Sequence, residues 1–270
     1  MNLKKLKKQV QELTAKANFS LGSDVSGLLA KAYRLEKNKR AKNALKQIID
    51  NADIAKKERV AICQDTGLPL IFIEAGKKIT ISNDLVEAIK QGVEDGYRKN
   101  FLRRSIVDPL KRGRSSYRGA IVHLDFTPKV SGLKITVFPK GFGSENKTRL
   151  KMFDPTADFT EIEQFIVESV QLAGAQACPP FLVGVGIGGT SDTALLLAKK
   201  ALIEKANILN STEKKILKKI NMLKIGPMGL GGPTTCLSVK IRTQDTHIAG
   251  LPVGVNISCH ALRRATLQIL

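Results

Sequence analysis

The sequence predicts an α+β fold, with a mixed or antiparallel central sheet flanked by helices and a helical N-terminal segment. Residues 1–58 are rich in Ala, Leu and Lys, and Leu3, Leu6 and Val10 repeat at helical spacing. Short apolar or alternating segments, typical of strands, follow in the rest of the chain and are separated by amphipathic segments. Two alternating segments lie so close together that they predict a hairpin, which a wholly parallel sheet would lack.

The first elements after residue 58 are a strand and a helix. "LPLIFIEAG" (68–76) is a continuous apolar run, typical of a buried strand. "NDLVEAIKQGVEDGYRK" (83–99) is amphipathic, and Ser82 or Asn83 is its expected N-cap. A polar, basic loop is expected over residues 108–119. "AIVHLDFTP" (120–128) and "GLKITVFPK" (132–140) then form the predicted hairpin.

The second half of the chain alternates in the same way. We expect helices over residues 160–177, 191–206, 211–224 and 259–270, and strands over residues 181–187, 236–244 and 251–258. No internal repeat or linker-like tract interrupts this series. The sequence therefore predicts a single domain over residues 1–270, with residues 1–58 as a helical N-terminal layer.

The net charge of +20, from 44 basic and 24 acidic residues, has two interpretations. A basic stripe that binds nucleic acid is one, because phosphate neutralisation releases counterions. Solvated lysine-rich helix faces, such as "EKKILKKI" (213–220), are the other. The charge is spread over several helices and the chain contains no tryptophan, so we expect no nucleic-acid partner. No stretch approaches the length of a membrane span and no secretory signal begins the chain, which predicts a cytoplasmic protein without a membrane partner.

Three of the four cysteines stand at predicted element boundaries. Cys63 precedes a polar motif, Cys178 precedes two prolines, and Cys259 opens the predicted last helix. Cys236 instead enters an alternating strand, where it is expected to pack as a small apolar residue. The spacing contains no CxxC pair, which argues against a zinc ribbon. From spacing alone, a three-cysteine metal site and inert buried thiols both stay open.

"GVGIGG" (184–189) matches the dinucleotide fingerprint G-x-G-x-x-G between a strand and a helix. A nucleotide-dependent oxidoreductase is therefore an alternative function. The fingerprint requires a second parallel strand that ends in an acidic residue about 20 residues on. More helix is predicted there, and Glu204 lies on that helix, so a glycine turn that lines a pocket is the favoured interpretation.

Six motifs occur in order along the chain. They are "CQDTG" (63–67), "KGFGSENKT" (140–148), "ACPP" (177–180), "GVGIGGTSD" (184–192), "GPMGLGGPTT" (226–235) and "THIAGLPVGVNISCHALRR" (246–264). Together they resemble the class I, iron–sulfur-dependent fumarate hydratase and L-tartrate dehydratase family. The length and the ending resemble the α subunit of its two-subunit form, so the swivelling domain is expected on a separate β subunit in a hetero-oligomer.

The resemblance implies a cofactor and its ligands. In this family three cysteines hold a [4Fe–4S] cluster, and the fourth iron is left open for substrate. The motif cysteines correspond to Cys63, Cys178 and Cys259, whereas Cys236 matches no ligand position. Clusters usually have four thiolate ligands, so the missing fourth thiolate would make one iron a Lewis acid.

The resemblance also implies substrate contacts. They correspond to Gln64, Asp65, Arg103, Gly143, Lys147 and His247. Arg104 is adjacent to Arg103, and the alignment alone separates the two. Each position has an ordinary structural alternative: a turn for Asp65, a surface pair for the arginines, a core or supporting role for His247, and a brace of the glycine loop for Lys147.

The chemistry expected of such a site is the reversible addition of water to a C4 dicarboxylate, with fumarate and L-malate as the first expectation and L-tartrate as the next. Hydroxide is a poor leaving group, and a metal that polarises its oxygen lowers the barrier. Arginine binds carboxylates bidentately, and a base must remove a proton beside a carboxylate. Asp65 and His247 are the expected catalytic residues, although a β-subunit residue could serve as the base instead. No residue distinguishes fumarate from tartrate.

Overall fold

The computed structural model describes residues 2–269 and confirms the α+β class, with its strands divided between two mixed four-stranded sheets. The chain divides into two compact units. The first unit comprises Met1–Gly22, Asn51–Phe142 and Arg263–Leu270, and the second comprises Ser23–Asp50 and Gly143–Leu262. Each unit has a hydrophobic core of its own. Within residues 2–269, no helix combines the length and the apolar composition needed to cross a bilayer.

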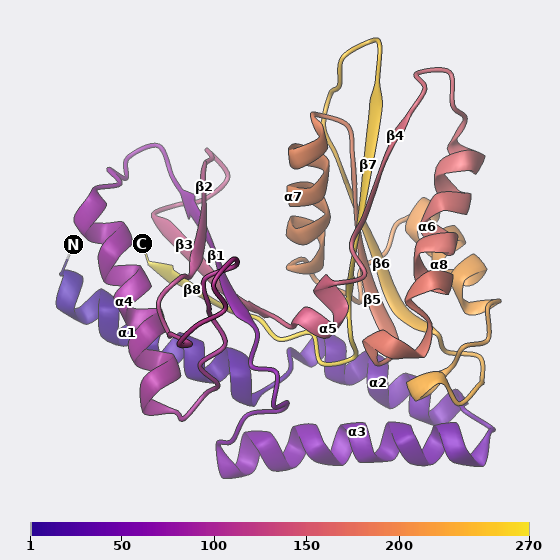
Figure 1. Cartoon of the computed structure of the whole chain (residues 1–270), viewed down its shortest axis with the longest axis horizontal. Coiled ribbons are helices and arrows are strands. Elements are labelled where there is room, and N and C mark those ends of the chain that lie inside the picture. Colours follow the sequence, from indigo (N-terminus) through magenta and orange to yellow (C-terminus); the bar gives the residue numbers. More distant parts are fainter. Residues whose placement is uncertain (1, 270) are drawn as a thin grey trace. The chain divides into compact units, whose positions relative to one another are not determined.

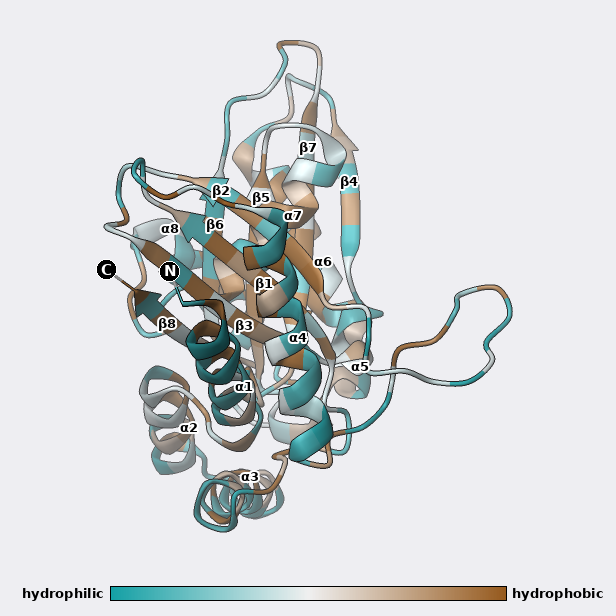
Figure 2. Ribbon diagram, turned by 90° about the vertical axis from the view of Figure 1, so that its left-hand side faces the viewer, coloured by the Kyte–Doolittle hydropathy of each residue, from teal (hydrophilic) through white to brown (hydrophobic). Residues whose placement is uncertain are grey.

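The first unit is a sheet with two helices packed together. Its elements are α1 (Leu3–Phe19), β1 (Leu68–Ala75), α4 (Asn83–Lys99), β2 (Ile121–Phe126), β3 (Leu133–Lys140) and β8 (Ala265–Ile269). The strand order is β2-β1-β3-β8, in which β1 pairs parallel with β2 and antiparallel with β3. Figure 2 shows that β1 and β3 are hydrophobic along most of their length. Their side chains, such as Ile71 and Ile135, form the core with Val10 of α1 and Ile89 of α4.

The second unit is a sheet covered by helices on both faces. Its strands are β4 (Arg149–Phe153), β5 (Phe181–Ile187), β6 (Cys236–Thr243) and β7 (Leu251–Ser258). Their order is β4-β7-β5-β6, with only β5 and β6 parallel. Figure 1 shows α7 (Ser191–Leu202) on one face of this sheet, and α6 (Phe159–Ala173) and α8 (Ser211–Asn221) on the other.

The remaining elements are short or lie at the unit boundary. Helix α2 (Ser23–Leu35) belongs to the second unit, and α3 (Lys39–Glu58) begins in the second unit and ends in the first. The short helix α5 (Phe142–Glu145) precedes β4, and the 3-10 helices η1 (Gly174–Ala177) and η2 (Pro227–Gly229) follow α6 and α8. The N-terminal segment is therefore helical, as predicted. The prediction of one catalytic domain over residues 1–270 stays a prediction.

Most predicted elements are confirmed, and Ser82 is the N-cap of α4, its side chain accepting the Leu85 N–H at 3.2 Å. The predicted hairpin over residues 120–140 is wrong. β2 and β3 are not neighbours, because β1 lies between them and pairs with both. The alternation that suggested a hairpin reflects two separate pairings with the same apolar strand. The predicted mixed sheet, for which the hairpin was the argument, is nevertheless present.

The predicted last helix over residues 259–270 is also wrong. Residues 259–264 are irregular, and β8 pairs antiparallel with β3, for example Ile135 with Leu267. The apolar spacing of "ALRRATLQIL" fits a half-buried edge strand as well as a helix, and tertiary pairing decides between them. Cys259 therefore opens no helix. Strand β4 was not predicted, because its exposed Leu150 and Met152 do not mark a buried face.

The glycines of "GVGIGG" let α7 approach the sheet closely. Val183 and Val185 point into the core shared with α6 and α8, whereas Gly184 and Gly186 alternate with them and face α7. A Cβ at Gly184 would lie 2.0 Å from the carbonyl oxygen of Ala198. A Cβ at Gly186 would lie 2.0 Å from that of Ala194. These two glycines are thus explained by packing, without a nucleotide.

This packing predicts that Gly186→Ala lowers the free energy of unfolding by about 1–3 kcal/mol, the usual cost of overpacking. Chemical denaturation followed by circular dichroism measures it. The matched control is Gly27→Ala inside α2, where an added Cβ meets nothing within 4 Å. Because alanine favours a helix, this control should gain about 0.5–1 kcal/mol or stay unchanged. Equal destabilisation by both variants would contradict the packing account.

Candidate functional site

The loop Cys63–Gly67 leads into β1 and is fixed by hydrogen bonds from several segments of the first unit. Asp65 accepts the Gly67 N–H at 3.0 Å on one carboxylate oxygen and the Phe142 N–H at 2.7 Å on the other. The Tyr97 hydroxyl donates to the carbonyl oxygen of Thr66 at 2.6 Å. Burial raises the pKa of Tyr97 well above its ordinary value, so this phenol stays protonated and remains a donor.

Arg263 also holds this loop, and it was not predicted. Its side chain is 2% exposed, and its guanidinium donates to the carbonyl oxygen of Asp65 at 2.7 Å. Gly141 leaves room for this contact, because a Cβ there would lie 3.2 Å from the Asp65 carboxylate and 3.6 Å from the guanidinium. In the sequence, Arg263 is half of an ordinary-looking arginine pair. Its burial depends on the pairing of β8, which the sequence did not reveal.

Cys63 and Gln64 are less enclosed than the residues that follow them. The Cys63 thiol is half-buried and lies 3.1 Å from the side-chain oxygen of Gln64, which is exposed. This places a thiol and an amide together at the accessible start of the loop.

The structure distinguishes between the two neighbouring arginines. The Arg103 backbone N–H donates to the Thr66 hydroxyl at 3.1 Å, which places this residue beside the loop. Its side chain is exposed, and no hydrogen-bond or ion-pair partner for its guanidinium lies within residues 2–269. The Arg104 guanidinium instead stacks over the Tyr117 ring, 5.3 Å from its centroid. Arg103 is therefore the better placed of the two to bind an anion.

Cys178 and Cys259 are brought together in the second unit. The His260 backbone N–H donates to the Cys178 carbonyl oxygen at 3.3 Å, and the His260 ring Nδ1 lies 3.1 Å from the same oxygen. Cys178 adopts a left-handed conformation with φ of 55°, which is costly for a residue other than glycine. Both thiols are half-buried. Two segments about 80 residues apart in sequence are thus joined at the backbone of Cys178 and at the residue that follows Cys259.

Lys147 lies close to the Cys178 segment, and Gly143 has an open side. Lys147 Nζ donates to the side chain of Gln176 at 2.5 Å, two residues before Cys178. Gly143 lies in α5, and a Cβ there would meet nothing within 4 Å in the part of the chain that the structure describes. Any steric need for glycine at this position would therefore come from a ligand or a partner.

His247 lies far from these cysteines. It belongs to the connection between β6 and β7, which Figure 1 shows as a golden loop at the top of the second sheet. Its side chain is exposed, which excludes a core role, and its Nδ1 accepts the Ala249 N–H at 3.1 Å. Strand β7 runs eight residues from this loop to Cys259, a length of about 26 Å. Within the second unit, the structure therefore does not bring His247 close to Cys178 and Cys259.

The four cysteines differ in their surroundings. Cys236 is 2% exposed, and burial raises the pKa of its thiol to about 12. It packs in the core, as the sequence predicted. Cys63 belongs to the first unit, and Cys178 and Cys259 belong to the second. Among residues 2–269, no group of three His, Cys, Asp or Glu side chains is already gathered for a metal ion.

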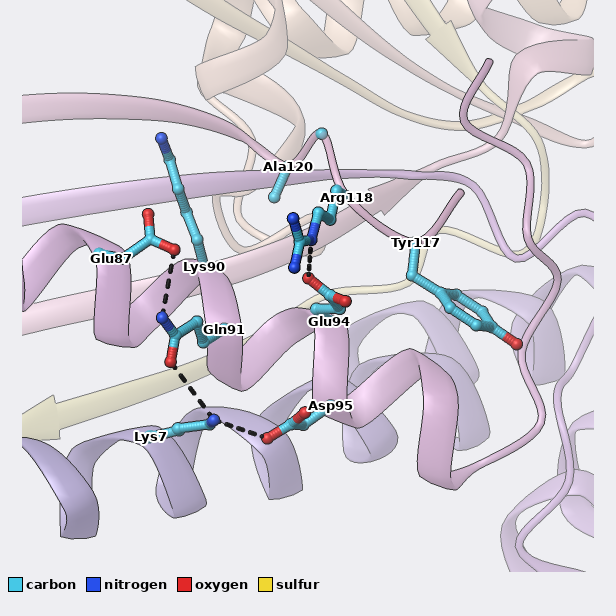
Figure 3. A pocket seen from close by; sticks show the side chains of 10 residues that line it. Lys7, Glu87, Lys90, Gln91, Glu94, Asp95, Tyr117, Arg118 and Ala120 are labelled. Carbon is cyan, nitrogen blue, oxygen red and sulfur yellow. Dashed lines mark hydrogen bonds and ion pairs between the residues drawn. The ribbon is translucent and has the colours of Figure 1, made fainter. Parts of the chain in front are cut away.

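Two cavities lie away from the loop Cys63–Gly67 and from Cys178 and Cys259. One, of about 440 Å³, lies between α1, α4 and residues 117–120 of the first unit (Figure 3). Its charges pair with one another, as Lys7 does with Asp95 at 3.0 Å and Arg118 with Glu94 at 3.4 Å. The other, of about 1090 Å³, lies between α2 and α8. Neither is lined by a predicted catalytic or substrate-binding residue.

Comparison with known proteins assigns the chain to a family. Residues 7–268 match the model of the family described as fumarate hydratase (fumerase). The chain belongs to the fumarate hydratase family. It is therefore a hydro-lyase, and the resemblance read from the six motifs is confirmed.

Several relatives match this fumarate hydratase family chain over nearly its whole length. A protein of Methanocaldococcus jannaschii, provisionally named L(+)-tartrate dehydratase subunit alpha, is 41% identical over 98% of both chains. The L(+)-tartrate dehydratase subunit alpha of Escherichia coli K12 is 29% identical over 98% of this chain and 91% of its own. That of Shigella sonnei is similar to the same extent.

The surroundings of the thiols predict their reactivity in the folded apoprotein. At pH 8, Cys63, Cys178 and Cys259 should react with iodoacetamide at least tenfold faster than Cys236. The pKa of Cys236 is raised in the fold, so its thiol stays protonated at this pH, and burial excludes the reagent. Peptide mass spectrometry measures each rate, and a denatured sample, in which all four should react, is the control. Equal rates in the folded protein would contradict this assignment.

Proposed function

We propose that this chain is the cluster-bearing subunit of a hydro-lyase that reversibly hydrates or dehydrates a four-carbon dicarboxylate. The observation that supports this most directly is the hydrogen bond between Cys178 and His260, the residue that follows Cys259, which joins the segments of two accessible cysteines. Thiols that only fill space are buried, as Cys236 is, whereas these two are accessible and lie in irregular segments. Family membership adds the reaction class.

The proposed cofactor is a [4Fe–4S] cluster with one open iron site, held by Cys63, Cys178 and Cys259. The donor set fits such a group, because iron–sulfur clusters are bound by cysteine thiolates and all three thiols are accessible. When bound, the open iron would supply Lewis-acid polarisation of the substrate hydroxyl.

The side chains around the first cysteine are suited to binding the substrate. The exposed guanidinium of Arg103 would bind a substrate carboxylate bidentately. Gln64, beside Cys63, would donate or accept a hydrogen bond at the same substrate. Gly143, with its open side, would offer a backbone N–H, and Lys147 would add a positive charge. These contacts would orient the substrate before a proton moves.

Asp65 is the proposed general base within this chain. Each of its carboxylate oxygens already accepts one backbone N–H, which fixes its orientation, and each retains a further lone pair. A carboxylate held in this way would remove the proton beside the substrate carboxylate without first reorienting. A residue of the partner subunit is the alternative base.

A β subunit completes the proposed enzyme. The relatives carry the name "subunit alpha", which implies a second kind of subunit, and this chain matches nearly the whole length of those alpha subunits. We therefore propose a hetero-oligomer that acts in the cytoplasm, in which both units of this chain form one catalytic domain. The swivelling domain would reside on the β subunit.

The test is hydro-lyase activity of the anaerobically reconstituted chain with and without its β subunit. We expect turnover of fumarate and L-malate or of L-tartrate only when both chains are present, and its loss on prolonged exposure to air. Fumarate is followed by its ultraviolet absorbance and tartrate by release of oxaloacetate. Full turnover by this chain alone would contradict the need for a partner. Absence of turnover with every substrate, despite a loaded cluster, would contradict the proposed function.

The names of the relatives give L-tartrate more weight than the motifs alone did. The ratio of kcat/KM for L-malate to kcat/KM for L-tartrate decides between these two substrates. A ratio at least a hundredfold in favour of one substrate would identify it, since one hydroxyl can be discriminated to this extent or more.

A further inference from the structure

We infer that the motif "GPMGLGGPTT" (226–235) positions Cys178, one of the three proposed cluster ligands. The inference rests on the proposed function, in which the Cys178 thiol binds the cluster. The part of the motif that carries it is the stretch from residue 225 to residue 232, called here the 225–232 loop. This loop follows α8, contains η2 and leads toward β6, so it lies wholly in the second unit together with Cys178.

The 225–232 loop has a fixed shape that its backbone determines. The Gly231 N–H donates to the carbonyl oxygen of Ile225 at 2.8 Å, which closes the loop. A Cβ at Gly226 would lie 1.7 Å from the carbonyl oxygen of Gly231, so the two ends of the loop are in contact. Met228, Gly229 and Gly231 have φ of 53°, 76° and 82°, a left-handed backbone that favours glycine.

The loop contacts the chain on both sides of Cys178. The Met228 N–H donates to the carbonyl oxygen of Pro179, the next residue, at 2.8 Å. On the other side, a Cβ at Gly229 would lie 2.4 Å from the Cβ of Ala175 in η1. Glycine is therefore required at this point, because any side chain would displace η1 from the loop.

Cys178 needs such support, because its own backbone is strained. Its φ of 55° is unfavourable for a residue with a side chain, and such a conformation persists only where the surroundings impose it. The loop contacts on either side, together with the bond from the His260 N–H to the Cys178 carbonyl oxygen at 3.3 Å, supply these surroundings. The backbone of Cys178, and with it the direction of its Cβ, is thus fixed before a cluster binds.

The turn between α2 and α3 supports the loop from its other side. A Cβ at Gly232 would lie 2.3 Å from a carboxylate oxygen of Glu36, which is 2% exposed. The other oxygen of this carboxylate accepts two backbone N–H groups of the turn, each at 2.9 Å. The Asn38 side chain donates to the carbonyl oxygen of Leu230 at 3.0 Å. The loop therefore lies between this turn and the segment of Cys178, and both sides restrain it.

The test compares two alanine substitutions in the same loop. Gly229→Ala places a Cβ against Ala175, at 2.4 Å. Gly231→Ala is the matched control, because its backbone is left-handed to the same extent. A Cβ there would meet only the side-chain nitrogen of Asn38, at 3.6 Å, which is an ordinary contact. The two variants therefore share the backbone strain and differ in the overlap with η1.

The readout is the rate at which iodoacetamide alkylates each thiol of the folded apoprotein. Overlap with η1 favours displacement of the segment that holds Cys178, so Gly229→Ala should accelerate alkylation of Cys178 about tenfold. In Gly231→Ala this rate should stay close to that of the wild type. Cys63 lies in the first unit and should react at its wild-type rate in both variants. Equal Cys178 rates in the two variants would overturn the inference.

A second substitution separates the contact from a general loss of stability. Adding Ala175→Gly to Gly229→Ala removes the atom that overlaps, and the nearest remaining atom, the Cα of residue 175, lies at 3.4 Å. The double variant should fold, and its Cys178 should react at the rate found in Gly231→Ala. This comparison also holds if Gly229→Ala alone does not fold. A double variant that fails to fold, or whose Cys178 still reacts fast, would overturn the inference.

Bound iron after anaerobic reconstitution tests the connection to the proposed function separately. Gly229→Ala should retain about half of the wild-type iron or less, because a displaced ligand weakens the site, whereas the double variant should bind as much as Gly231→Ala. Full iron in every variant, with the expected alkylation rates, would reject Cys178 as a cluster ligand and leave the positioning of its thiol intact. Unchanged alkylation would reject the positioning whatever the iron content.

Discussion

The antiparallel pairing of β5 with β7 is the constraint on which the second unit depends. Its register places Leu182 opposite Ser258, so the segments that follow α6 and β7 meet at one end of the sheet. The His260 backbone N–H then donates to the carbonyl oxygen of Cys178, which brings the segments of Cys178 and Cys259 into contact. The same register carries the β6–β7 connection to the opposite end. One strand pairing thus gathers two proposed cluster ligands and sets His247 apart from them.

The first unit fixes its own part of the site by a different means. Its loop has no regular structure, so side chains from elsewhere replace the hydrogen bonds that a strand or helix would provide. Asp65 accepts two backbone N–H groups, the Tyr97 hydroxyl bonds to Thr66, and the buried Arg263 bonds to the carbonyl of Asp65. These bonds restrict the loop before any ligand binds, which lowers the entropic cost of binding.

The sequence predicted what depends on local patterns and missed what depends on long-range pairing. Apolar periodicity and caps located α4, α7 and β5, because burial of one face is written into the spacing of the residues. Insertion of β1 between β2 and β3, and β8 in place of a helix, depend on partners far along the chain. In the candidate site, the alternating pattern around Cys236 separated it from the other cysteines. The burial of Arg263 and the distance of His247 from Cys259 depend on the strand pairing and could not be predicted from the sequence.

The central claim is that Cys63, Cys178 and Cys259 together hold the cluster, although they come from two units. The most direct measurement is bound iron and sulfide after anaerobic reconstitution of each Cys→Ser variant. The account predicts about four of each per chain for wild type and for Cys236→Ser, and a marked loss for any of the other three. Full iron and sulfide in folded Cys63→Ser, or loss in Cys236→Ser alone, would contradict it.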